Sequence, residues 1–305
     1  MNILFVDIVH PLLKKELELK GNICDEAHHK SQTEILSIID NYDGIILRSR
    51  IIIDANFLSK CNKLKFIARA GAGLENIDVE YAKQKGISCY NAAEGNRQSV
   101  AEHAIGMLLS LFNNLNKSDN QVRKGKWQRE CNRGIELANK TIGIIGFGNS
   151  GSALAEILKG FNVKILSFDK YRTDYLFKTS MKEIYEKVDI ISLHIPLTNE
   201  TNYLADKSFF NQFYKSIYLI NTSRGECVNT KDLVIAIKNK KVLGACLDVL
   251  EFEDTSFENL LNDSNKEIKY LINSDKTILS PHIAGWTKES NIKIAKVLLE
   301  KITSV

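Results

Sequence analysis

The chain of 305 residues carries 41 Lys and Arg against 37 Asp and Glu, which gives a formal net charge of +4. The two signs are interspersed and form no basic block, so the composition argues against a nucleic-acid-binding protein. Hydrophobic residues make up 44% of the chain, enough for a sizeable core, yet no apolar run approaches the ~18 residues of a membrane span. The length favours about two domains.

The first residues and the cysteines indicate the compartment. Residues 1–7 contain no basic segment, and the acidic Asp7 interrupts the apolar run early. They therefore predict a first strand and not a signal peptide. The six cysteines form no CxxC pair and have no His at zinc-finger spacing, and most lie in apolar surroundings. Such thiols are typical of a reducing compartment. We therefore expect a cytoplasmic protein without a metal site and without a membrane partner.

In the first third of the chain, short apolar segments alternate with polar or amphipathic stretches of helical length. This alternation predicts a parallel sheet with helices on both faces. A long helix should follow over about 99–122, because its apolar residues recur close to the 3.6-residue period. The expected strands are Ile3–Val6, Gly44–Leu47, Phe66–Ala68 and Ile87–Tyr90.

A second alternating series begins near residue 140 and ends with a helix expected over about 288–302. Its nearly continuous β-branched runs are typical of strands that are buried on both faces. Pro196 and Pro281 directly follow two of these runs and mark strand ends, because proline cannot continue the hydrogen-bond ladder. The expected strands are Thr141–Ile145, Lys164–Phe168, Ile190–Leu193, Ile217–Ile220, Val242–Asp248 and Thr277–Leu279.

A glycine turn, Gly146-x-Gly148-x-x-Gly151, stands between the first of these strands and an amphipathic stretch expected to be helical over 152–161. The first glycine permits a tight turn, the second lets the backbone approach a pyrophosphate, and the third lets helix and strand pack closely. The alternative is a glycine-rich turn without a ligand. The flanking strand and helix favour a dinucleotide site.

Asp169 ends the next strand, 23 residues after Gly146 (169 − 146). A carboxylate at this place would accept the ribose hydroxyls of a dinucleotide. Its charge favours NAD, because the 2′-phosphate of NADP would be repelled. Lys170 and Arg172 stand just beyond and leave NADP as the alternative.

Polar residues follow four later strands, where the carboxyl ends of a parallel sheet would converge on the reactive end of the cofactor. Hydride transfer from an alcohol needs a base, a carboxylate that orients this base, and a guanidinium for the substrate carboxylate. His282, Glu253 and Arg224 supply one of each. Structural roles for Arg224 and His282 remain alternatives, and Glu251 and Asp254 compete with Glu253 for the second role.

Arg48 and Arg50 flank Ser49 after the expected strand Gly44–Leu47. Two guanidiniums and a hydroxyl would suit a phosphate on the substrate. Two solvated surface arginines are an equally good interpretation. His194, by contrast, is expected to be a structural residue at a strand end.

Six motifs occur in an order that resembles one known family, the D-isomer-specific 2-hydroxyacid dehydrogenases, over essentially the whole chain. They are Ala70–Asp78, Gly95–Glu102, the glycine turn, Asn221–Gly225, Asp248–Glu253 and Pro281–Ile283. The resemblance implies an α/β protein of two doubly wound parallel-sheet domains, with a Rossmann nucleotide domain (98–284) inserted into a flavodoxin-like substrate domain (1–97 and 285–305). It also implies an enzyme that acts on a small hydroxy or keto acid, and we expect a phosphorylated acid as the substrate. An unphosphorylated acid and an NAD-sensing binding protein are the alternatives.

The resemblance assigns roles to individual residues. It implies Arg224 as the substrate anchor, His282 as the acid/base and Glu253 as the partner of His282. The implied further contacts to the substrate are Arg48, Ser49, Arg50, Gly71 and Gly73. The implied contacts to NAD are Ala72, Gly146, Gly148, Asn149, Ser150, Gly151, Asp169, Ile195, Pro196, Thr222, Asp248, His282 and Gly285.

Four positions depart from the family pattern, among them Glu94, which follows Ala93 where a proline is common and adds a negative charge near the interdomain crossover. Asn149 stands where the family usually has Arg, which removes one positive contact to the phosphates. Asp254 stands where a proline is usual, and Trp286 fills a position that often holds a smaller residue, either as a wall of the substrate pocket or as part of the core.

The resemblance also implies a larger organisation. We expect a homodimer formed by the long helix and Lys124–Trp127. We further expect hinges near Asn96 and Gly285, with the substrate bound between the domains, and no C-terminal regulatory domain.

Overall fold

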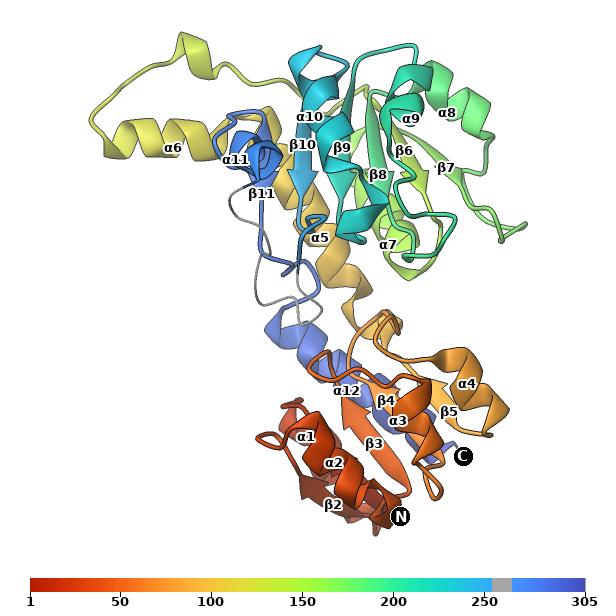
Figure 1. Cartoon of the computed structure of the whole chain (residues 1–305). Coiled ribbons are helices and arrows are strands. Elements are labelled where there is room, and N and C mark those ends of the chain that lie inside the picture. Colours follow the sequence, from red (N-terminus) through yellow and green to blue (C-terminus); the bar gives the residue numbers. More distant parts are fainter. Residues whose placement is uncertain (254–264, 305) are drawn as a thin grey trace. The chain divides into compact units, whose positions relative to one another are not determined.

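The computed structural model describes residues 1–253 and 265–304 (Figure 1). The described residues fold into two compact units. Unit 1 contains residues 1–97 and 285–304, and unit 2 contains residues 98–253 and 265–284. Each unit is built on one parallel sheet with helices on both faces, which confirms the predicted α/β class. No helix in the described ranges has both the length and the apolar character needed to cross a membrane.

The sheet of unit 1 has the order β2-β1-β3-β4-β5. The chain direction across the sheet reverses between β1 and β3, and such switch points are where open α/β sheets bind ligands. β2 was not expected, because three of its four residues are exposed and its sequence does not alternate. The strands are β1 (Asn2–Phe5), β2 (Ile23–Glu26), β3 (Gly44–Leu47), β4 (Phe66–Arg69) and β5 (Ser88–Tyr90).

Alternate strand residues of unit 1 pack against different helices. Ile3 and Phe5 share a cluster with residues of α1 and α12, whereas Leu4 shares a cluster with residues of α2, α3 and α4. This two-residue period places hydrophobic side chains on both faces of the sheet. The helices are α1 (Pro11–Leu19), α2 (Gln32–Ile38), α3 (Ala55–Ser59), α4 (Val79–Gln84) and α12 (Lys288–Thr303), with a short 3₁₀ helix η1 (Ile39–Asn41).

The expected long helix is two helices. α5 (Ala93–Phe112) begins earlier than predicted, and α6 (Leu115–Arg123) follows after a break at which Asn114 adopts a φ of 52°. Asn is one of the few residues that adopt this left-handed conformation readily, so the break needs no glycine. Every residue of α6 remains at least partly exposed. A short 3₁₀ helix, η2 (Glu130–Asn132), lies beyond it.

The sheet of unit 2 has the order β11-β10-β9-β8-β6-β7, and all its strands run parallel. Its switch point lies between β6 and β8, which are hydrogen-bonded neighbours. The strands are β6 (Thr141–Ile145), β7 (Lys164–Phe168), β8 (Ile190–Leu193), β9 (Ile217–Asn221), β10 (Val242–Leu247) and β11 (Thr277–Leu279).

The two faces of this sheet are covered by different helices. Residues of α5 and α7 pack with Ile142 and Ile144 on one face, and residues of α8, α9, α10 and α11 pack with Ile145 and Ile191 on the other. The helices are α7 (Asn149–Leu158), α8 (Met181–Lys187), α9 (Lys207–Gln212), α10 (Thr230–Lys238) and α11 (Lys266–Ile272), with 3₁₀ helices η3 (Lys159–Phe161) and η4 (Gly225–Cys227).

Candidate active site

The glycine turn connects β6 directly to α7. Gly146 has a φ of 89°, and a Cβ atom there would lie 2.2 Å from the carbonyl oxygen of His194. A Cβ atom on Gly151 would lie 2.1 Å from the carbonyl oxygen of Gly146, so helix and turn can approach closely only without side chains at these positions. A Cβ atom on Gly148, by contrast, would meet nothing within 4 Å. The open side at this N-cap residue lets a phosphate approach the backbone N–H groups of α7.

α7 begins three residues earlier than predicted, so Asn149 and Ser150 belong to its first turn. The turn therefore fits the pyrophosphate of a dinucleotide through backbone groups and the Ser150 hydroxyl.

Asp169 follows β7 and is tied to the glycine turn. Its carboxylate accepts the N–H groups of Phe147 (2.8 Å), Tyr171 (2.9 Å) and Arg172 (3.0 Å). Burial raises the pKa of Asp169, but these hydrogen bonds and the Arg172 charge outweigh burial and hold the pKa below its ordinary value. The two nearby cations are engaged elsewhere, because Lys170 pairs with Glu200 at 2.6 Å and Arg172 donates to the carbonyl of Phe147.

His194 follows β8 and lies buried beside the glycine turn. Its Nδ1 atom is 3.3 Å from the Oγ atom of Ser150, and its Nε2 atom is 2.8 Å from the Oγ atom of Ser192. Burial lowers the pKa of His194 to about 4, so this imidazole is neutral at neutral pH. Ile195 continues the chain past the turn, where its Cγ2 atom would lie 3.0 Å from a Cβ atom on Gly146. Pro196 ends this segment, and its carbonyl accepts the Thr201 hydroxyl.

The loop after β9 positions Arg224. Asn221 is fully buried, and its side chain accepts the N–H and the hydroxyl of Ser223 (3.1 and 2.7 Å) and donates to the carbonyl of Arg224 (2.9 Å). The Arg224 guanidinium donates to the carbonyl of Ser223. Thr222 lies between Asn221 and Ser223 in the chain. Within the described part of the chain, the buried Oγ1 atom of Thr222 has no hydrogen-bond partner. Such an atom is satisfied when a polar ligand group reaches it.

Asp248 anchors the loop that carries His282. It is 1% exposed, and its carboxylate accepts the Ser280 hydroxyl (2.6 Å) and the N–H groups of Ile283 and Ala284 (2.9 Å each). The Nε2 atom of His103 on α5 lies 3.5 Å away. Burial raises the pKa of Asp248, but these hydrogen bonds, with that of His103 the largest, hold the pKa below its ordinary value. The resemblance implies that Asp248 contacts the cofactor. In the structure, both carboxylate oxygens of Asp248 accept hydrogen bonds from the loop that carries His282.

His282 and Glu253 form a close pair. The Nδ1 atom of His282 lies 2.6 Å from Glu253 Oε2, and the other carboxylate oxygen accepts the N–H of Leu250. His282 has a φ of 53°, which costs about 1–3 kcal/mol, and its N–H donates to the Asp248 carbonyl at 2.7 Å. Glu251 is engaged elsewhere, by the Tyr203 hydroxyl and the N–H of Thr230. Asp254, the other competitor, lies outside the described residues.

Arg50 connects three segments of unit 1. Its guanidinium pairs with Asp7 through Nε (2.9 Å) and donates to the carbonyls of Lys30 (2.7 Å), Val6 (2.6 Å) and Ala27 (3.3 Å). These bonds use all three nitrogen atoms of the side chain. The sequence leaves Arg50 open between a phosphate contact and a surface arginine, and these contacts give it a structural role. Its partners lie in the segments that follow β1 and β2, which sequence patterns do not bring together.

The segment Gly71–Gly73 follows β4, and the side chain of Arg69 fixes its position through hydrogen bonds. This buried guanidinium donates to the carbonyls of Arg48 and Gly73 (both 3.0 Å). Gly71 leaves room for it, because a Cβ atom there would lie 2.8 Å from Nη1 of Arg69. Ala72 accepts the Asn91 amide through its carbonyl (2.7 Å). Neither Arg69 nor Asn91 was singled out in the sequence.

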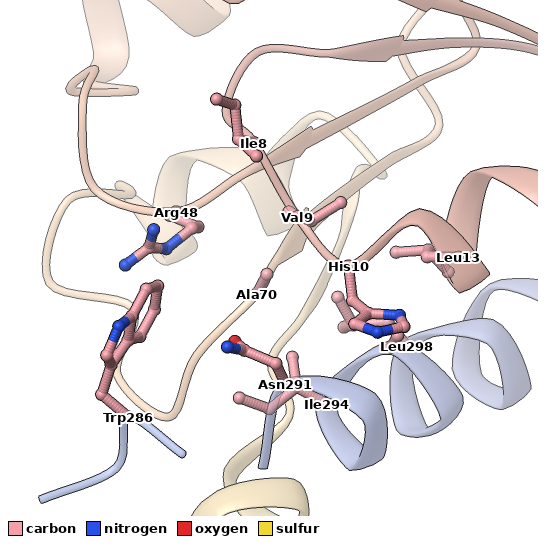
Figure 2. A pocket seen from close by; sticks show the side chains of 11 residues that line it. Ile8, Val9, His10, Leu13, Arg48, Ala70, Trp286, Asn291, Ile294 and Leu298 are labelled. Atoms are coloured by element: carbon pink, nitrogen blue, oxygen red, sulfur yellow. The ribbon is translucent and has the colours of Figure 1, made fainter. Parts of the chain in front are cut away.

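A cavity of about 200 Å³ lies at the carboxyl edge of this sheet (Figure 2). Ile8, Val9 and His10 line it after β1, Arg48 lines it after β3, and residues of α12 complete the wall, so it flanks the switch point between β1 and β3. The Arg48 guanidinium carbon lies 3.9 Å from the ring centroid of Trp286. Trp286 is 49% exposed and lines this cavity, so it is not part of the core. Ser49 lies beside Arg48 and is not among the lining residues.

The doubly wound sheet, the glycine turn and Asp169 together are the elements of a dinucleotide-binding domain. Residues 105–284 match the model of the D-isomer specific 2-hydroxyacid dehydrogenase NAD binding domain. The chain is similar to the hydroxypyruvate reductase of Thermotoga maritima, with 32% identity over 292 residues that cover 95% of this chain and 91% of that protein. The chain belongs to the D-isomer-specific 2-hydroxyacid dehydrogenase family, as the motifs predicted, and is an NAD-dependent enzyme.

Two further relatives describe the range of the family. The D-3-phosphoglycerate dehydrogenase of Archaeoglobus fulgidus is 33% identical over 285 residues, which cover 90% of this chain and 51% of that protein, so the chain spans about half of its length. The structure of D-lactate dehydrogenase from Aquifex aeolicus, complexed with NAD and lactic acid, is 28% identical with a TM-score of 0.82 and covers 100% of this chain and 95% of that one.

Proposed function

We propose that this dehydrogenase oxidises D-3-phosphoglycerate to 3-phosphohydroxypyruvate, a reaction that feeds serine biosynthesis. The observation that carries the phosphorylated substrate is the place of Arg48, whose guanidinium lies at the wall of the cavity at the carboxyl edge of the unit 1 sheet. A guanidinium is well suited to bind a phosphate through paired hydrogen bonds. Ser49, Gly71 and Gly73 would complete this substrate segment, and unit 1 would be the substrate domain.

The chemistry rests on three residues of unit 2. The Nε2 atom of His282 takes the proton of the substrate hydroxyl, while Glu253 holds Nδ1 and stabilises the positive charge that develops on the ring. Arg224 binds the substrate carboxylate. NAD, when bound, supplies the hydride acceptor. In the reverse direction His282 returns the proton to the carbonyl oxygen.

The cofactor would lie along the carboxyl ends of β6, β7 and β8. Backbone groups of Gly148 and the first turn of α7 bind the pyrophosphate, Asp169 binds the ribose, and Thr222 offers its buried hydroxyl to the cofactor. Ala72, Ile195, Pro196, Asp248 and Gly285 would contribute through backbone atoms or packing.

A reductase of hydroxypyruvate or glyoxylate is the second candidate. The engagement of Arg50 with Asp7 and three carbonyls supports it, because only one of the two expected phosphate-binding guanidiniums remains at the cavity. The match to a hydroxypyruvate reductase also covers nearly the whole of both chains. Without a phosphate on the substrate, Arg48 would contribute little to selectivity.

We also propose a homodimer formed by α6 and the segment after it. Trp127 is 80% exposed, and Leu115 and Val122 of α6 are about half exposed, an arrangement typical of a surface that is covered by a partner. Light scattering of the purified chain should give the mass of two copies; the mass of one copy would remove this proposal.

The substrate proposal is tested by a panel assay. Purified protein is given NADH with 3-phosphohydroxypyruvate, hydroxypyruvate or glyoxylate, and NAD with D-3-phosphoglycerate, and kcat/KM is measured for each from the NADH absorbance. The phosphorylated pair should be preferred. A large preference for hydroxypyruvate or glyoxylate would replace this proposal by the second candidate.

A further inference from the structure

Ser150 and His194 meet across the switch point of the unit 2 sheet. Ser150 lies in the first turn of α7, just after β6, and His194 lies just after β8, the neighbour of β6. Their Oγ and Nδ1 atoms are 3.3 Å apart, and the Nε2 atom of His194 is 2.8 Å from Ser192 Oγ. The three polar side chains therefore form a continuous line from the interior of the sheet to the glycine turn.

When an anion accepts a hydrogen bond from Ser150, the hydrogen bonds between Ser192, His194 and Ser150 all run in the same direction. A neutral imidazole donates from one nitrogen and accepts at the other, and burial keeps His194 neutral by lowering its pKa to about 4. With the proton on Nδ1, Ser192 donates to Nε2, His194 donates to Ser150, and the Ser150 hydroxyl proton is left to point outward. With the proton on Nε2, Ser150 must donate to His194 and can offer only lone pairs to a ligand.

The glycine turn itself carries no positive side chain between residues 146 and 152. Arg172 contacts the turn, but its guanidinium donates to the Phe147 carbonyl and lies near the Asp169 carboxylate. Phosphate recognition at this turn therefore depends on neutral donors, and each hydrogen bond to a charged group is worth more than one between neutral groups.

We propose that His194 is a positioning residue for the cofactor, which holds the Ser150 hydroxyl as a donor to the pyrophosphate of NAD. Ser192 supplies the fixed end of this line, and successive hydrogen bonds of the same direction strengthen one another. His194 thus acts through Ser150 and does not touch the reacting atoms. The inference rests on NAD binding at the glycine turn and does not depend on which hydroxy acid is the substrate.

The first test compares binding of ADP-ribose and of adenosine, measured by competition with NADH fluorescence. Ser150→Ala and His194→Leu should each weaken ADP-ribose binding about tenfold and leave adenosine binding within about twofold. The double variant should be no weaker than Ser150→Ala, because both changes remove the same hydrogen bond. Ser152→Ala is the matched control, since the Ser152 hydroxyl already donates to the Asn149 carbonyl; its affinities should not change.

In the binding assay, two results would overturn the proposal: additive losses in the double variant, or equal losses for adenosine and ADP-ribose. His194→Asn guards against misfolding of the leucine variant, because its amide can still donate to Ser150 and should retain most of the affinity. Nitrogen-15 NMR of histidine-labelled protein supplies an independent readout. His194 should carry its proton on Nδ1 in the NADH complex; a proton on Nε2 in that complex would contradict the proposed direction.

Discussion

Replacing Arg50 by Ala should destabilise unit 1 without changing substrate choice. The wild-type guanidinium pairs with Asp7, whose side chain is 9% exposed, and also donates to three backbone carbonyls. Removing one partner of a buried ion pair costs about 3–5 kcal/mol. Because the Arg50 side chain is itself 37% exposed, water compensates for part of this loss. We therefore expect a loss of about 3 kcal/mol in the free energy of unfolding.

Arg48→Ala is the matched comparison at a position two residues away. Its backbone N–H bond to Asp7 is retained, and the stacking of its guanidinium on Trp286 is a partly exposed cation–π contact worth about 0.5–1 kcal/mol. This variant should therefore unfold within about 1 kcal/mol of the wild type. Under the substrate proposal it should lose its preference for phosphorylated over unphosphorylated keto acid by about tenfold or more.

Urea unfolding followed by circular dichroism measures the stability of both variants, and the keto acid panel measures their selectivity at a temperature where both are folded. The reasoning is refuted if Arg50→Ala keeps the wild-type stability and loses selectivity for the phosphorylated acid. That result would make Arg50 a substrate ligand and not a structural residue.

Three further predictions follow from the geometry of unit 2. Glu253→Gln should lower kcat about 10- to 100-fold with little change in KM, since a charge-assisted bond to His282 is lost; Glu251→Gln is the control and should change kcat by less than about threefold. Gly151→Ala should weaken NADH binding more than about tenfold, because its Cβ atom would lie 2.1 Å from a backbone oxygen, and an unchanged affinity in a fluorescence titration would contradict this. His194 has a pKa lowered from 6.5 to about 4 by burial, so the unfolded chain takes up the proton first and stability falls as the pH drops through this interval. The loss should reach about 3 kcal/mol and be absent in His194→Asn; identical pH profiles of stability would show that His194 is not the cause.

The sequence predicted the features that depend on short segments. Thr141–Ile145 and the glycine turn were located because strand, turn and helix are adjacent in the chain, and because Gly146 and Gly151 stand where a side chain would clash with backbone. The break between α5 and α6 was missed because Asn114 interrupts a continuous helical period only through its backbone conformation. β2 was missed because an exposed edge strand lacks the apolar alternation that reveals a strand.

The contacts of individual site residues were harder to predict. The partners of Arg50 lie 20 to 44 residues away in the chain, and its neighbour Arg48 has the same local surroundings in the sequence. Glu251 and Glu253 are likewise indistinguishable by type and spacing. Only the loop geometry distinguishes them, because Glu251 accepts the Tyr203 hydroxyl and Glu253 pairs with His282. Asn221 was recognised in the sequence only as part of a motif, and its hydrogen bond to the carbonyl of Arg224 is set by the fold of the loop.

The central proposal is the phosphorylated substrate, and one ratio tests it most directly. With NADH as the reductant, kcat/KM is measured for 3-phosphohydroxypyruvate and for hydroxypyruvate under identical conditions. One charge-assisted contact from a guanidinium to the phosphate should favour the phosphorylated acid by about tenfold or more. A ratio of one, or a preference for hydroxypyruvate, would contradict the assignment and identify the enzyme as a reductase of unphosphorylated keto acids.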